Sequence, residues 1–229
     1  MSKRKILRTS IIATVLVVFF LLVMFFAPLS TTKAFDASEY NYDLKYTAEL
    51  DGMSVMSQRT EYTCFVVSMA IVRNYLGLET TEDGLRNELN VMDRNEGMMP
   101  GEYTSYFNKA LEPLSYSASL VNPKSQAEIL NVIIQSLMNG LPVVFLYSAM
   151  DDWNKPNYNT HYGVIYGIDM RKEIIKISNP YGYLQEIAFA DMFEGLSFQS
   201  YESEPFMFRL GRKTGIIKEN NLFVLEKTV

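Results

Sequence analysis

The stretch from Gln58 to Gly77 holds the only cysteine of the chain, Cys64, and this count limits how the chain can fold. One cysteine excludes an internal disulfide bond. Together with the only histidine, His161, it also excludes the usual Cys/His zinc sites, which need three or four such ligands. We therefore expect no metal and no cofactor.

The composition is that of a globular protein. The chain has 229 residues, and about 195 remain after an N-terminal apolar segment, which suits one domain with a sizeable core. Charged residues make up 21% and hydrophobic residues 48% of the chain, which argues against disorder. The net charge is −5 and no basic residues follow one face, so we expect no nucleic-acid partner.

The N-terminus combines positive charge with an apolar run from Ile11 to Ala27. The basic residues before the run are Lys3, Arg4, Lys5 and Arg8. This order keeps the N-terminus in the cytoplasm and directs the rest of the chain outward. The run exceeds a signal-peptide core of about 7–15 residues and falls slightly short of a span of about 20. We expect a signal anchor in the cell membrane, or alternatively a cleaved signal peptide and a secreted domain.

These features predict four parts. They are a cytoplasmic basic tail at 1–10, a transmembrane signal anchor at 11–29, an extracytoplasmic stalk at 30–52 and a folded domain at 53–229.

The pattern of the domain predicts helices first and strands afterwards. Helices are expected at 64–75 after a Thr63 cap, from Thr80 or Thr81 to Leu89, at 102–111, and from a capping box at 125–128 to Gly140. Strands are expected at 142–147, 161–168, 173–178, 184–189, 205–210 and 221–225, with a short strand or extended segment at 53–56 and a short helix or turn at 191–196. This order predicts an α+β fold with an antiparallel sheet.

Cys64 is a candidate nucleophile because it opens an apolar helix. Unpaired N–H groups and the dipole at a helix N-terminus favour the thiolate, and a nearby histidine lowers the thiol pKa further. The alternative is that Cys64 only fills space in the core, as free cysteines often do.

His161 and Asn179 are predicted to lie together. A hairpin between the strands at 161–168 and 173–178 brings the start of the first strand beside the end of the second. His161 can then act as a base, and the amide oxygen of Asn179 can fix its tautomer. Taken alone, His161 is as compatible with a surface or capping position, and Asn-Pro is a common turn pair.

Gln58 is the fourth candidate. A glutamine shortly before the nucleophile helix can donate its side-chain N–H to a developing oxyanion, together with the backbone N–H of Cys64. The alternative is an exposed polar loop residue.

These motifs resemble a known family. The residues that carry the resemblance are Gln58 and Cys64, then His161-Tyr-Gly-Val-Ile-Tyr-Gly-Ile-Asp169, then Ile177-Ser-Asn179-Pro-Tyr-Gly182, and also Ser68, Ala70, Asn74, Tyr75 and Gly77 in the first helix. Together they resemble the papain-like cysteine peptidases, and among them the double-glycine-leader (bacteriocin-processing) peptidase-like group. The resemblance covers roughly residues 53–196. It implies a papain-like fold with Cys64 as nucleophile, His161 as base, Asn179 as orienting residue and Gln58 as oxyanion donor.

Two residues depart from the family pattern. Phe65 stands where the family usually has glycine, which raises the question of crowding at the active site. Asn179 stands where the family usually has aspartate, although papain itself uses asparagine there. Neither departure removes a reacting atom.

The expected function is that of a membrane-tethered, extracytoplasmic cysteine peptidase or amidase acting on a peptide or protein. Two alternatives stay open: a catalytically weak or inactive binding or immunity module at the cell surface, and an acyltransferase that uses the same triad. In either case aromatic residues could line a peptide groove. The candidates are Tyr103, Tyr106, Trp153, Tyr158, Tyr181 and Tyr183.

Overall fold

The computed structural model describes residues 12–20, 45–92, 100–149, 159–197 and 206–228. The chain divides into two compact units. Unit 1 comprises Met1–Thr31 and Ser203–Lys218, and unit 2 comprises Thr32–Glu202 and Glu219–Val229. Unit 2 contains all four candidate site residues.

Unit 2 is built on an antiparallel sheet with the strand order β2-β7-β3-β4-β5-β6. A further strand, β1, pairs with the end of β4 that extends past β3. The strands are β1 (Thr47–Glu49), β2 (Tyr116–Val121), β3 (Val143–Ala149), β4 (Asn159–Asp169), β5 (Ile174–Asn179), β6 (Tyr183–Ala188) and β7 (Leu222–Lys227). The expected α+β arrangement is confirmed.

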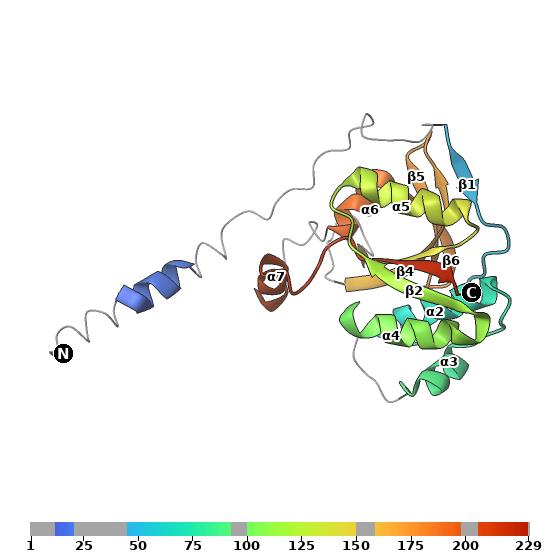
Figure 1. Ribbon diagram of the computed structural model, residues 1–229, viewed down its shortest axis with the longest axis horizontal. Helices are drawn as coiled ribbons and strands as arrows, with labels where there is room; N and C mark the ends of the chain where they lie inside the picture. Colours follow the sequence, from blue (N-terminus) through green and yellow to red (C-terminus); the bar gives the residue numbers. More distant parts are fainter. Residues whose placement is uncertain (1–11, 21–44, 93–99, 150–158, 198–205, 229) are drawn as a thin grey trace. The chain divides into compact units, whose positions relative to one another are not determined.

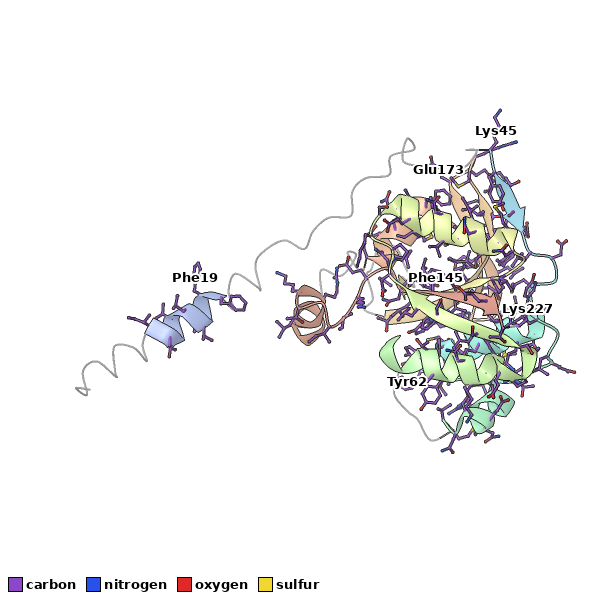
Figure 2. All side chains as sticks on the ribbon, in the orientation of Figure 1. Phe19, Lys45, Tyr62, Phe145, Glu173 and Lys227 are labelled. Carbon is purple, nitrogen blue, oxygen red and sulfur yellow. The ribbon has the colours of Figure 1, made fainter. Side chains whose placement is uncertain are left out.

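Helices cover both faces of this sheet (Figure 1). Two of them, α5 (Gln126–Met138) and α6 (Phe189–Leu196), pack on one face, over a core that includes the fully buried Phe145 (Figure 2). The other face carries α2 (Cys64–Tyr75), α3 (Glu82–Leu89) and α4 (Pro100–Leu111), and the short 3-10 helix η2 (Glu112–Leu114) follows α4. Each face of the sheet is therefore buried under apolar helix surface, which supplies the main stabilising term.

Two predicted helix caps are confirmed. The Thr81 hydroxyl oxygen accepts a hydrogen bond from the Gly84 N–H at 3.1 Å and starts α3. The Ser125 hydroxyl accepts from the Glu128 N–H at 3.2 Å and starts α5. The Glu128 carboxylate in turn accepts from the backbone N–H of Lys124 at 2.6 Å, one residue earlier than a standard capping box would have it.

The motif residues at the end of α2 hold the fold together. The Asn74 side chain accepts from the N–H of Thr80 at 2.7 Å and donates to its carbonyl at 3.0 Å, so it clamps the turn between α2 and α3. The Tyr75 hydroxyl donates to the carbonyl of Gly140 at 2.8 Å, and Gly77 has a φ of +93°, which favours glycine. These residues of the family pattern therefore stabilise the fold and are not among the candidate catalytic residues.

Two predictions near the C-terminus and in the middle of the chain are corrected. A strand was predicted at 205–210, but the described part of this segment belongs to helix α7 (Phe206–Lys213) in unit 1. The Thr214 N–H continues its helical pattern to the Leu210 carbonyl at 2.9 Å. Strand β2 was not predicted, because Tyr116–Val121 mixes small polar with apolar residues and becomes a strand through its pairing with β7.

The start of the domain also differs from the prediction. Residues 47–49, expected in the stalk, form β1 and belong to the sheet. Residues 53–56 form no strand, and a single bridge between Ser57 and Tyr181 follows them.

The predicted signal anchor at 11–29 lies largely outside the described residues, of which 12–20 are helical. No helix within the described ranges has the length and hydropathy needed to cross a membrane.

Candidate active site

The first turn of α2 lacks the side-chain cap that the sequence predicts at Thr63. The Thr63 hydroxyl donates instead to the carbonyl of Thr60 at 3.1 Å. The N–H groups of the first turn are then left to other partners. Backbone N–H groups of Cys64 and Phe65 approach the Cys64 sulfur, as does the backbone N–H of Tyr162 from β4. This last contact brings the sulfur next to the residue that follows His161.

The Cys64 thiol is buried, with 8% of the residue exposed. Burial raises the pKa of Cys64 above its ordinary value, and the three backbone N–H groups lower it by less than burial raises it. Burial thus has the larger effect on the pKa, while the N–H groups at the helix N-terminus act in the expected direction and favour the thiolate. The thiol needs a base at the moment of reaction.

His161 and Asn179 meet as the hairpin geometry predicts. The imidazole Nε2 lies 3.0 Å from the Asn179 Oδ1, and each residue is only 2% exposed. His161 lies near the start of β4 and Asn179 at the end of β5, and these two strands pair antiparallel. The predicted proximity of the two residues is confirmed.

A backbone contact assigns the histidine tautomer. The backbone N–H of Tyr181 donates to Asn179 Oδ1 at 3.0 Å, and since a backbone N–H only donates, this atom must be the amide oxygen. An oxygen facing His161 Nε2 requires a proton on that nitrogen. In the neutral ring Nδ1 then carries the lone pair and is the atom that can take a proton.

Aromatic rings hold the imidazole in place. Tyr181 stacks on the His161 ring with centroids 4.3 Å apart and planes inclined by 9°. Tyr147 meets the same ring edge-on at 5.7 Å. The sequence suggested Tyr181 only as a groove residue, because its stacking depends on the turn that follows Asn179.

Two residues of β6 complete the surroundings of Asn179. Its Nδ2 donates to Gln185 Oε1 at 3.0 Å and lies 3.3 Å from the Tyr183 hydroxyl. Sequence reasoning missed Gln185. The only signal for it is its place two residues after Tyr183, which pairs with Asn179 across the β5–β6 hairpin.

Gln58 lies beside the turn that carries Asn179. The Ser57–Tyr181 bridge and a hydrogen bond from the Gln58 N–H to the Pro180 carbonyl at 2.6 Å join the two segments. The Gln58 side chain donates from Nε2 to the Thr60 carbonyl at 3.0 Å, while its Oε1 is buried with no partner in the part of the chain that the structure describes. Its role as an oxyanion donor stays a prediction.

Phe65 does not crowd the site. It is 2% exposed and its ring lies in an aromatic cluster between α2, α4 and the sheet. The ring centroids of its neighbours lie 4.0–5.9 Å away, and they belong to Tyr103, Tyr162, Phe223 and Phe107. Tyr103 is therefore a core residue and not a groove residue. Trp153 and Tyr158 lie outside the described residues.

Among the described residues, no group of three or more His, Cys, Asp or Glu side chains is placed to hold a metal ion.

The chain is similar to solved structures at low sequence identity. One is a double glycine motif protease from an AMS/PCAT transporter, in complex with its leader peptide, with 13% identity and a TM-score of 0.50 over 80% of this chain and 99% of that one. Another is a C39-like peptidase from Bacillus anthracis, with 17% identity and a TM-score of 0.49 over 80% of this chain and 100% of that one. No curated protein sequence matches the chain.

This chain has helices packed on an antiparallel sheet, as the double glycine motif protease does, and its fold is therefore of the papain-like α+β class. Within this class the family is shown by a match over residues 50–203 to the Peptidase C39 like family, and the chain belongs to that family.

Proposed function

We propose that this protein is a cysteine peptidase or amidase that cleaves a peptide amide with Cys64, His161, Asn179 and Gln58. The observation that carries the proposal is the buried His161–Asn179 pair beside Tyr162, whose backbone N–H reaches the Cys64 sulfur. Membership in the Peptidase C39 like family supports thiol chemistry. The leader peptide bound to the double glycine motif protease supports a peptide as the class of substrate.

The mechanism begins with proton transfer. His161 Nδ1 takes the thiol proton while the sulfur attacks the substrate carbonyl carbon, because burial of Cys64 disfavours a free thiolate. The hydrogen bond between Nε2 and Asn179 Oδ1 stabilises the imidazolium that forms.

The carbonyl oxygen then becomes an oxyanion. The Cys64 backbone N–H and the Gln58 side-chain amide stabilise its charge. The C–N bond breaks as the imidazolium gives its proton to the leaving amine. A water molecule, deprotonated by His161, attacks the thioester and releases the acid and the free thiol.

The direct test is alkylation of the full chain by iodoacetamide at about pH 6, where an ordinary thiol with a pKa of about 8.5 hardly reacts. Although burial raises the pKa of Cys64, we expect His161, acting as a general base, to let the thiol react at this pH, and His161→Ala to abolish the reaction. Since the chain has one cysteine, the label reports on one site. Slow labelling that is unchanged in His161→Ala would reject the proposal, and an acyl adduct on Cys64 seen by mass spectrometry would support it.

We further propose that the domain works outside the cytoplasmic membrane, tethered by residues 11–29. The support is the order of basic residues, apolar run and domain in the sequence. Protease accessibility of the domain in intact cells tests this, because a cytoplasmic domain stays protected.

A further inference from the structure

The amide of Asn179 uses its full hydrogen-bonding capacity. Its oxygen faces the Tyr181 N–H and His161 Nε2, both at 3.0 Å. Its nitrogen faces Gln185 Oε1 at 3.0 Å and the Tyr183 hydroxyl at 3.3 Å. An amide has two acceptor sites and two N–H groups, so all of them are matched.

The two ends of this network are held differently. The oxygen end is held by the backbone of the turn at Tyr181, which no substitution of a side chain removes. The nitrogen end is held by side chains of β6, and the half-buried Gln185 makes the shorter of its two contacts. A substitution of Gln185 can therefore change the orientation of the Asn179 amide toward His161.

We propose that Gln185 is a positioning residue that acts through Asn179 to hold His161 in the tautomer with the proton on Nε2. This rests on the proposed function, in which Nδ1 is the base. Loss of the Gln185 acceptor leaves an N–H of a buried amide without its partner, so Asn179 gains by turning toward water and away from the imidazole.

The side chain at 185 also determines which side chain at 179 it can hydrogen-bond. The Gln185 amide can rotate and present either an oxygen or an N–H, so it can pair with an amide or with a carboxylate. A glutamate at 185 can pair only with the amide. Two carboxylates at this distance would repel each other and one would stay protonated.

The first test removes the acceptor with Gln185→Leu and compares it with Gln185→Glu, which keeps an acceptor. Losing a hydrogen bond of ordinary strength predicts a decrease of about two- to tenfold in the rate of Cys64 alkylation for Gln185→Leu. Gln185→Glu should retain the rate. Gln135→Leu on the exposed surface of α5 is the matched control, and thermal midpoints check that each variant folds.

A second readout does not depend on reactivity. The chain has one histidine, so its imidazole nitrogen signals in NMR spectra are unambiguous. We expect the Nε2–H tautomer in the wild type and in Gln185→Glu, and a mixture of tautomers in Gln185→Leu. A wild-type rate and a pure Nε2–H tautomer in Gln185→Leu would overturn the proposal.

A third test introduces a negative charge at both positions, 179 and 185. Because two facing carboxylates repel each other, Asn179→Asp combined with Gln185→Glu should lower the alkylation rate by more than the product of the two single effects. Additive effects would contradict the coupling. If wild-type alkylation proves independent of His161, the proposed function fails, while the tautomer measurement still decides the role of Gln185.

Discussion

The two sides of the candidate site differ in how fully their polar groups are hydrogen-bonded. On the sheet side, Asn179 has every polar atom of its amide bonded and His161 is stacked and buried. On the helix side, Thr63 makes no capping bond and the buried Oε1 of Gln58 has no partner within the described segments. The hydrogen bonds of the Asn179 amide are complete before a substrate arrives, whereas the Gln58 side-chain nitrogen gives one N–H to the Thr60 carbonyl and carries a second N–H that can donate to an oxyanion.

This difference fits the needs of the proposed reaction. A base must have a defined tautomer and direction, which a saturated hydrogen-bond network supplies. An oxyanion exists only during the reaction, so its donors must stay available until then. The comparison predicts that changes on the sheet side affect proton transfer, while changes at Gln58 affect only reactions that form an oxyanion.

The largest effect is expected for His161→Ala. Loss of a general base lowers rates by about 10²- to 10⁴-fold. Since burial raises the pKa of Cys64, alkylation of the variant should begin only at pH values above those of an ordinary thiol. The measurement is the pH dependence of iodoacetamide labelling. An unchanged pH profile would show that the sheet side supplies no base.

Phe65→Ala should come next, through the stability of the fold. The ring is buried in the aromatic cluster, and removing a buried phenylalanine costs about 3–5 kcal/mol of unfolding free energy. Urea unfolding followed by circular dichroism measures this loss. A cost below that range, with faster labelling of Cys64, would mean that Phe65 shields the site after all.

Gln58→Ala separates the two sides most clearly. Removing one oxyanion donor costs about 10²- to 10³-fold in acyl transfer. The acylation of Cys64 by p-nitrophenyl acetate forms an oxyanion and should slow by this amount, whereas alkylation by iodoacetamide forms none and should be unchanged. Equal losses in both reactions would mean that Gln58 only shapes the loop before Cys64.

Tyr181→Leu is expected to have the smallest effect. Aromatic pairs contribute about 0.5–1.5 kcal/mol beyond burial, so the labelling rate should fall by about two- to tenfold. The backbone N–H of residue 181 is retained, so the tautomer of His161 should be kept. A shift of the tautomer in the imidazole NMR signals would show that the ring, and not the backbone, orients Asn179.

Local patterns were enough for much of the fold. The caps at Thr81 and Ser125 and the β4–β5 hairpin could be predicted, because each depends on residues close in sequence. Strand β2 and helix α7 could not, because the first depends on its partner β7 and the second carries an apolar run that suits either structure.

The sequence by itself determined which residues can do the chemistry, since one cysteine and one histidine leave no other candidates for a thiol and an imidazole. Hairpin connectivity added Asn179. Only the tertiary structure decided that burial raises the pKa of Cys64, that the Phe65 ring packs in an aromatic cluster and that Gln185 accepts a hydrogen bond from Asn179. The reason is physical: burial and cross-strand hydrogen bonds arise from residues distant in sequence, which meet only when the sheet and helices have packed.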